Sequence, residues 1–229
     1  MTLPPRNLRA LATDFDGTLA HHGAVDESTL RAMERLKHAG FRIILVTGRE
    51  LNEFLAIFPE VEIFDLAVME NGALLYRPQK GEAVPLCEPP PSEFVARLHA
   101  AGLPLQVGKA IVATWEPHEN KVLEVIKEMG LELQVTFNKG AVMILPSGVN
   151  KATGLLAALQ ELGLQPAQVA GVGDAENDHA FLSVCGYSVA VANALSAIKE
   201  KVHYVTTSGH GAGVTELVEL MLSGVEKPA

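Results

Sequence analysis

The chain has few cysteines, no long apolar run and no run of basic residues, and each scarcity excludes a class of protein. Cys87 and Cys185 are its two cysteines and could form at most one disulfide, so neither a disulfide framework nor a zinc knuckle is expected. Apolar runs such as residues 43–46 and 141–145 are far shorter than the ~20 residues that span a bilayer, so no membrane association is expected. The first residues carry no apolar leader, and we therefore expect a cytoplasmic protein.

The charge of the chain is predominantly acidic, because 18 lysines and arginines against 27 aspartates and glutamates give a net charge of −9. Such a chain is a poor candidate for binding nucleic acid, which is recognised through basic side chains. A small anionic substrate is compatible with this charge, because a metal ion could supply the positive charge. With 48% hydrophobic residues among 229, the chain can bury the core of one large or two small domains, which excludes disorder.

Both ends of the chain alternate between short apolar runs and amphipathic segments. Apolar runs such as residues 41–46 are typical of strands buried on both faces of a parallel sheet, and residues 27–39 carry apolar side chains at helical spacing. The pattern predicts strands at 8–13, 41–46, 66–69, 169–172, 188–192 and 204–205, and helices at 27–39, 51–58, 152–162, 178–184, 195–201 and 214–222. Repeated strand–helix units predict an α/β fold with a Rossmann-like open parallel sheet and helices on both faces.

The middle of the chain departs from this pattern. Three consecutive prolines at 89–91 mark a boundary, and the sequence G-L-x-L-Q-V then occurs twice, at 102–107 and 130–135. Each copy follows an amphipathic segment and precedes a second apolar run, with turn residues at 108–109 and 138–140 between the runs. This order predicts an inserted αββαββ domain at residues 86–147, between the two parts of a core domain at 1–85 and 148–229.

Two motifs lie directly after predicted strands, where open α/β sheets place their ligands. Residues 14–17 (D-F-D-G) put two carboxylates two positions apart, so that one can attack a reacting centre while the other transfers protons. A polar turn without a function would have the same composition. Residues 47–49 (T-G-R) offer a hydroxyl and backbone N–H groups to a phosphoryl oxygen, although Thr-Gly is also a common end of a strand.

Two further motifs follow the insert. Lys151 stands at the start of a predicted helix, where the helix dipole disfavours a cation, so its position calls for an anionic partner unless the side chain is simply exposed. Residues 171–178 (G-V-G-D-A-E-N-D) hold several acids and an amide on a glycine-flanked turn. Oxygen ligands of this kind suit a hard cation, although the same acids could cap the next helix.

Taken together and in this order, the four motifs resemble those of the haloacid dehalogenase-like (HAD) superfamily of phosphotransferases. The resemblance is closest to the Cof-like branch, whose members carry a cap domain between the second and third motifs, where this chain carries its insert. It covers roughly residues 8–80 and 148–220, and two shorter matches, at 70–72 and 193–194, add to it.

The resemblance implies a role for each motif. Asp14 would be the nucleophile that forms an aspartyl-phosphate, and Asp16 would be the general acid and base. The catalytic and phosphate-binding groups would be completed by Thr47, Gly48, Lys151 and Asn177. The implied cofactor is Mg²⁺, and its site would comprise Asp14, Asp16 through its backbone carbonyl, Asp174 and Asp178, the last of which, with Asn177, would orient the outer shell and Lys151.

The resulting expectation is a Mg²⁺-dependent phosphatase that hydrolyses a small phosphomonoester, such as a sugar phosphate or phosphoglycolate. A dehalogenase is disfavoured, because it would need neither the acid at Asp16 nor the acidic loop at Asp174. Two alternatives stay open: a phosphomutase that uses the same motifs, and a non-catalytic protein that binds a phosphorylated ligand. The cap would select the substrate, with Lys109 and Lys139 as candidates for contact with its non-reacting end, and the oligomeric state is left open.

Overall fold

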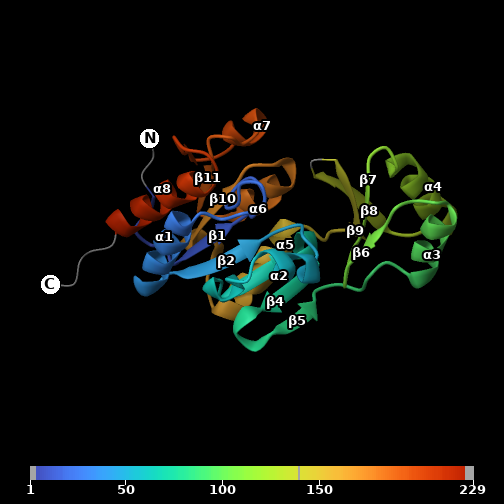
Figure 1. The fold of residues 1–229 in the computed structure, drawn as a ribbon, viewed down its shortest axis with the longest axis horizontal. Helices are drawn as coiled ribbons and strands as arrows, with labels where there is room; N and C mark the ends of the chain where they lie inside the picture. Colours follow the sequence, from blue (N-terminus) through green and yellow to red (C-terminus); the bar gives the residue numbers. More distant parts are fainter. Residues whose placement is uncertain (1–3, 139, 225–229) are drawn as a thin grey trace.

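The structure is a computed structural model and describes residues 4–138 and 140–224, so Lys139 lies outside the described residues. Two β-sheets organise the described chain, a large sheet of eight strands and a small sheet of four. The two sheets occupy opposite ends of an elongated molecule, with the small sheet beyond the edge at which β1 and β2 end (Figure 1).

Most strands of the large sheet are parallel, as predicted. They are β1 (Ala10–Thr13), β2 (Arg42–Val46), β3 (Leu66–Met69), β10 (Val169–Gly173), β11 (Tyr187–Ala190) and β12 (Tyr204–Val205). Their order in the sheet is β12-β11-β10-β1-β2-β3, and every neighbouring pair is parallel. The carboxyl ends of these strands therefore share one edge, which brings the loops after β1, β2 and β10 together.

Two antiparallel strands extend the sheet beyond β3 and were not predicted. They are β4 (Leu74–Arg77) and β5 (Glu82–Pro85), which pair with each other while β4 also pairs with β3. The sheet is thus mixed at this edge rather than parallel throughout. Pro85 ends the edge strand β5, a position that proline tolerates because no further strand needs its missing N–H.

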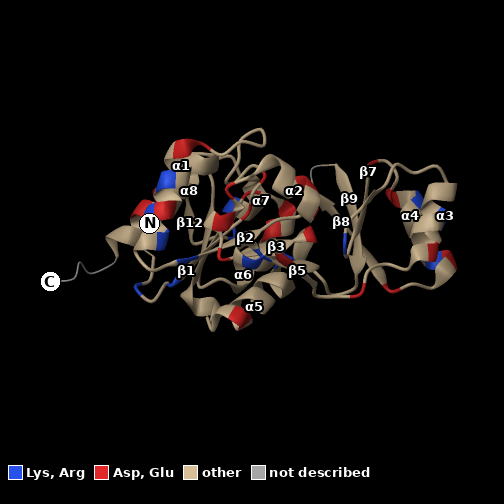
Figure 2. Ribbon diagram, turned by 60° about the horizontal axis from the view of Figure 1, so that its bottom comes forward, with Lys and Arg blue, Asp and Glu red and all other residues tan. Residues whose placement is uncertain are grey.

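The helices of the core cover both faces of the large sheet (Figure 2). They are α1 (Glu27–His38), α2 (Leu51–Ile57), α5 (Lys151–Leu162), α6 (His179–Val184), α7 (Ser196–Lys199) and α8 (His210–Ser223). Helices α1 and α8 pack together on one face, and α5 packs with α6 on the other. Helix α8 begins four residues before the predicted helix. For the other predicted core elements, both the first and the last residue lie within two residues of the observed bounds.

The small sheet belongs to the inserted segment, whose elements follow the predicted αββαββ order. They are α3 (Ser92–Ala100), β6 (Gln106–Val107), β7 (Val112–Trp115), α4 (Glu119–Met129), β8 (Leu133–Asn138) and β9 (Ala141–Pro146). The strands are antiparallel in the order β6-β7-β9-β8. Side chains of α3 and α4 cover one face, on which Phe94, Val122 and Ile144 are buried together. On the other face, Met143 and Leu145 pack toward Ala73 of the core.

We call residues 86–147 the cap, and its bounds stay a prediction. None of the described helices is long and apolar enough to cross a membrane. The cytoplasmic location and the lack of a nucleic-acid partner also stay predictions of the sequence.

Candidate active site

Asp14 occupies the first position beyond β1, at the edge where the parallel strands end. Its backbone nitrogen donates to the carbonyl of Val172 (3.0 Å), which continues the ladder between β1 and β10 by one residue. The next residue, Phe15, is fully buried, with its ring centroid 5.0 Å from that of Phe54 and 5.5 Å from that of Phe58. The aromatic contacts hold the turn in place, so the carboxylate of Asp14 is fixed by the core beneath it.

Lys151 enters the same place from the start of α5. The side chain of Asn150 accepts hydrogen bonds from the backbone nitrogens of Ala152 (2.9 Å) and Thr153 (3.2 Å), which begins the helix at Lys151. The side chain of Lys151 is 1% exposed, and its Nζ lies 2.6 Å from Oδ1 of Asp14 and 2.6 Å from Oδ1 of Asp178. The anionic partner that its position predicted is therefore present twice.

Burial and charge act against each other at this buried cluster. Burial, reinforced by the negative charges of Asp178 and Asp174, raises the pKa of Asp14 to about 7, although Lys151 opposes this change. Burial alone would lower the pKa of Lys151, but the charges of Asp14 and Asp178 outweigh it and hold that pKa above its usual value. Lys151 is thus a fixed positive charge, and Asp14 is a carboxyl group whose protonation responds to its surroundings.

Asp14, Asp174 and Asp178 form a buried acidic cluster in which one carboxylate oxygen from each lies within 4.8 Å of the others. Thr18 donates its hydroxyl to Oδ1 of Asp174 (2.9 Å). Oδ2 of Asp178 accepts from the backbone nitrogens of residues 174 and 175 (2.8 and 2.9 Å), while its Oδ1 accepts from Lys151. The carboxylates of Asp14 and Asp174 fit a divalent cation such as Mg²⁺, while both oxygens of Asp178 already accept hydrogen bonds and orient its neighbours.

The carboxylate of Asp16 lies outside this cluster. Its two oxygens accept from Nε and Nη2 of Arg49 (2.6 and 2.7 Å), and Nη1 of Arg49 lies 2.8 Å from Glu53. The sequence placed Arg49 in a motif but gave no sign of this pairing, because the two residues come from different loops of the sheet edge. The bidentate contact fixes the direction of the Asp16 side chain in this structure.

Thr47, Gly48 and Asn177 complete the predicted set around the same loops. Thr47 is 1% exposed, and its hydroxyl accepts from the backbone nitrogen of Arg49 (3.2 Å). Gly48 approaches the cap so closely that a Cβ atom there would lie 3.0 Å from Cε of Met143. Asn177 donates to Oδ1 of Asn71 (3.3 Å), whereas its own Oδ1 is buried and has no hydrogen-bond partner within the described part of the chain.

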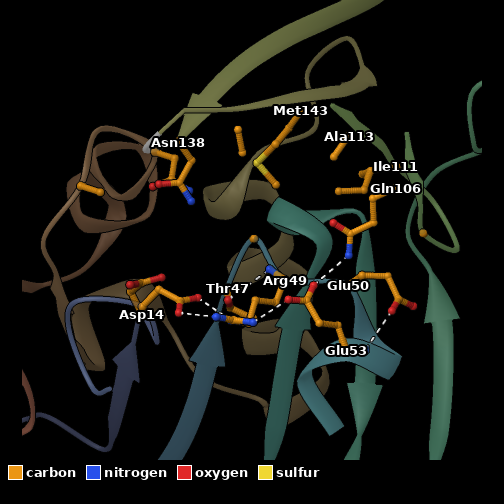
Figure 3. A pocket seen from close by; sticks show the side chains of 16 residues that line it. Asp14, Thr47, Arg49, Glu50, Glu53, Gln106, Ile111, Ala113, Asn138 and Met143 are labelled. Atoms are coloured by element: carbon orange, nitrogen blue, oxygen red, sulfur yellow. Dashed lines mark hydrogen bonds and ion pairs between the residues drawn. The ribbon is translucent and has the colours of Figure 1, made fainter. Parts of the chain in front are cut away.

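A cavity of about 140 Å³ lies between these loops and the cap (Figure 3). The core side carries Asp14, Asp16, Thr47, Gly48 and Asn177, and the cap side carries Gln106, Ile111, Ala113, Asn138 and Met143. Asn138 points from the end of β8 toward the core, and its Oδ1 is a second buried acceptor with no partner among residues 4–138 and 140–224. Two unpaired acceptors at one cavity indicate a site for a ligand that donates hydrogen bonds.

Sequence reasoning did not identify the cap residues that line the cavity. The available signal was strand alternation, because Ala141 and Met143 lie on one face of β9 while Val142 and Ile144 lie on the other. The predicted candidate Lys109 has an exposed side chain and does not line the cavity. Its backbone nitrogen instead donates to Glu70 of the core (2.9 Å).

Comparison with known proteins identifies a family for the chain. The family model of the haloacid dehalogenase-like hydrolases matches residues 11–107 and 109–218. A phosphoglycolate phosphatase from Methanothermobacter thermautotrophicus is 30% identical over 222 residues, covering 92% of this chain and 97% of its own.

Among solved structures, a HAD/COF-like hydrolase from Plasmodium vivax has a TM-score of 0.79 at 22% identity and covers 95% of this chain and 96% of its own. A HAD subclass IIB sugar phosphatase has a TM-score of 0.76 at 18% identity, with coverages of 95% and 100%. These two likenesses show the fold. From the family model and the relative at 30% identity, the chain belongs to the haloacid dehalogenase-like hydrolase family, which confirms the predicted membership of that superfamily.

Proposed function

We propose that this chain is a Mg²⁺-dependent phosphatase that hydrolyses a small phosphomonoester through an aspartyl-phosphate on Asp14. The observation that carries the proposal is the buried contact between Lys151 and Asp14, the second of which lines the cavity. Lys151 binds one oxygen of Asp14. Its ammonium group would therefore lie beside the phosphoryl oxygens, on which negative charge develops in the transition state. The membership of a hydrolase family and the phosphatase relatives support the same reaction.

The substrate class follows from the size of the cavity and from the relatives. A cavity of about 140 Å³ is well below the ~300–1,000 Å³ of sites for drug-sized ligands. A phosphoglycolate phosphatase relative and a sugar phosphatase with the same fold both act on small molecules, by their names. We therefore infer a substrate of the phosphoglycolate or sugar phosphate type. Of the two, a sugar phosphate has hydroxyl groups that would donate to Asn138 and Asn177.

The acidic cluster would hold the metal ion. Asp14 and Asp174 would be carboxylate ligands, the backbone carbonyl of Asp16 would be another, and Asp178 would support the site through its contacts with Lys151 and the 174–175 backbone. Bound Mg²⁺ would offset the negative charge of the phosphoryl oxygens and of the surrounding carboxylates.

The chain's own residues supply the remaining chemistry. An oxygen of Asp14 attacks phosphorus as the bond from phosphorus to the leaving oxygen breaks, and Asp16 donates a proton to that oxygen to release an alcohol. In the second step Asp16 takes a proton from water, the water oxygen attacks phosphorus, and the bond to Asp14 breaks to release inorganic phosphate. Thr47, Gly48 and Asn177, which line the cavity, and Lys151, which contacts Asp14, would bind the phosphoryl oxygens in both steps.

Asp16 needs to change partners for this role. In the present structure both of its oxygens bind Arg49. Proton donation requires one of them to exchange Arg49 for the leaving oxygen of the substrate. Arg49 would keep its contact with Glu53 during that exchange and so stay in place.

A panel assay tests this function. The enzyme is incubated with 2-phosphoglycolate, several sugar phosphates and p-nitrophenyl phosphate, with Mg²⁺ or with a chelator, and inorganic phosphate is measured. We expect release that requires Mg²⁺ and is abolished in Asp14→Asn. A phosphomutase would instead move the phosphoryl group within a sugar phosphate, and a binding protein would bind a ligand without either change. Either result would refute the proposal.

A further inference from the structure

Glu70 joins the core to the cap through an arrangement that the proposed function does not use. It is the first residue of a short 3-10 helix, η2 (Glu70–Gly72), between β3 and β4, and it is fully buried. Its carboxylate accepts from the backbone nitrogens of Lys109 (2.9 Å), Ala110 (2.7 Å) and Ile111 (3.1 Å). These three residues form the turn between β6 and β7 of the cap, so one core carboxylate binds three consecutive N–H groups of that turn.

The same short helix holds the second motif. The backbone nitrogen of Glu70 donates to the carbonyl of Arg49 (3.0 Å), and that of Asn71 donates to the carbonyl of Thr47 (3.0 Å). Gly72 packs against the start of α5, where a Cβ atom would lie 2.0 Å from the carbonyl oxygen of Asn150. Helix η2 therefore fixes the cap turn relative to both the T-G-R loop and the helix that carries Lys151.

The backbone at Glu70 and Asn71 adopts an unfavourable conformation, which indicates that the position of the Glu70 carboxylate is important. Glu70 and Asn71 both have positive φ angles, 53° and 56°, in the left-handed region that side chains other than glycine and asparagine seldom adopt. Burial raises the pKa of Glu70, although the three backbone N–H groups oppose the rise. A concave run of N–H groups is a good receptor for an anion, so the turn and the carboxylate are matched.

On the cap side, the β6–β7 turn packs closely against the carboxylate of Glu70. A Cβ atom on Gly108 would lie 2.7 Å from Oε2 of Glu70, a distance that such atoms do not tolerate. Gly108, which precedes the residues bound by Glu70, and Ile111, which is the last of them, also line the cavity. Any shift of the turn relative to Glu70 therefore moves the wall of the cavity. A second contact, from Gln106 to Glu53 (2.8 Å), lies on the same hairpin.

We propose that Glu70 is a positioning residue that sets where the β6–β7 turn of the cap stands over the phosphate-binding loop, and thereby which leaving groups fit the cavity. This inference rests on the proposed function for its consequence, the choice of substrate. Its physical basis, the docking of the turn, can be measured without any substrate.

Hydrogen exchange tests the docking directly. Glu70→Gln keeps the shape of the side chain but replaces one acceptor oxygen by an amino group that faces N–H donors. Because hydrogen bonds to a charged acceptor are stronger than those to a neutral one, we expect amide exchange at residues 109–111 to become at least about tenfold faster. Glu216→Gln is the matched control, since Glu216 accepts from the backbone nitrogens of Thr207 (2.9 Å) and Ser208 (3.3 Å) away from the cavity. Unchanged exchange at 109–111 in Glu70→Gln would overturn the proposal.

A pair of substitutions gives a second test that does not depend on one variant. Gly108→Ala should also speed exchange at 109–111, because its Cβ atom would collide with the Glu70 carboxylate. In the Glu70→Ala background that carboxylate is gone, so adding Gly108→Ala should cause no further change. If Gly108→Ala speeds exchange at residues 109–111 by the same factor in the Glu70→Ala background as in the wild type, the turn is not held by Glu70.

The consequence for substrate choice is read from the KM and kcat of Glu70→Gln. For 2-phosphoglycolate or the most active sugar phosphate of the panel, we expect KM to rise by about threefold or more with little change in kcat, since the chemical groups are untouched. For p-nitrophenyl phosphate the fold-change in KM should differ from this value, because its leaving group has another shape. If exchange becomes faster in Glu70→Gln but the KM of every substrate stays at its wild-type value, the claim about substrate choice is overturned. If the wild type releases no phosphate at all, the proposed function fails, while the exchange results still decide whether Glu70 docks the turn.

Discussion

The ammonium nitrogen of Lys151 lies 2.6 Å from Oδ1 of Asp14, and both side chains are buried. Lys151 is also the only residue within the described chain that the structure places in ion pairs with two members of the acidic cluster. Its charge therefore offsets two carboxylates that would otherwise repel each other inside the protein.

Lys151→Met tests this balance. Removing one partner of a buried ion pair typically costs about 3–5 kcal/mol, because the remaining charge stays buried without compensation. We expect a fall of that order in the free energy of unfolding, measured by denaturant titration, together with loss of phosphate release. The exposed Lys201→Met is the control and should change neither quantity. A Lys151→Met protein as stable as the wild type would contradict the assigned role.

The raised pKa of Asp14 makes the effect of Mg²⁺ depend on pH. With a pKa of about 7 in the folded state against 3.8 ordinarily, Asp14 contributes stability at low pH that is lost as pH rises from about 4 to about 7. A metal ion needs the ionised carboxylate, so Mg²⁺ competes with the proton below pH 7. The Mg²⁺-induced rise in Tm should therefore be larger at about pH 8 than at about pH 5.5. Asp14→Asn should remove this difference, and equal shifts in the wild type at both pH values would count against the metal site.

Asp16→Asn tests the proton-transfer role through the leaving group. An alkoxide leaving group needs a proton, whereas the aryl oxide of p-nitrophenyl phosphate needs little assistance. The variant should lose most of its activity on 2-phosphoglycolate or a sugar phosphate, by about 10²-fold or more, and clearly less on the aryl phosphate. Steady-state phosphate release on both substrates measures this. Equal losses would argue that Asp16 acts through its contact with Arg49 instead.

Replacing Mg²⁺ by Ca²⁺ tests whether Asp14 is both a ligand and the nucleophile. Ca²⁺ accepts more oxygen ligands than Mg²⁺ and takes carboxylates in a bidentate manner, which would occupy the oxygen of Asp14 that attacks. We expect Ca²⁺ to raise Tm but not to support phosphate release. Full turnover with Ca²⁺ alone would mean that Asp14 does not combine the two roles.

Much of the core could be predicted from the sequence because parallel strands are apolar throughout and their carboxyl ends meet at one edge. The position of Lys151 at the start of a helix favoured an anionic partner, and the structure places Asp14 and Asp178 beside it. The hairpin β4–β5 was missed because its strands are short and lie directly before the predicted end of the first core segment at residue 85. The apolar side chains of such a hairpin also lack the helical spacing by which the helices were predicted.

Contacts between the core and the cap could not be predicted in the same way. The partners of Glu70 are backbone N–H groups, which every residue except proline has and which no side chain signals. The pairing of Asp16 with Arg49 joins loops whose separation depends on how the strands are ordered. Strand alternation could have assigned Met143 to the cavity face, but only if the orientation of the cap were known.

The central claim is that Asp14 carries the phosphoryl group during turnover, and an acid quench tests it most directly. The enzyme is mixed with Mg²⁺ and its best substrate from the panel, stopped by acid within one turnover, digested, and analysed by mass spectrometry. The account predicts one added phosphoryl group on the peptide that contains Asp14, removable by hydroxylamine, and none in Asp14→Asn. Rapid phosphate release with no modified peptide, or a phosphoryl group on another residue, would contradict it.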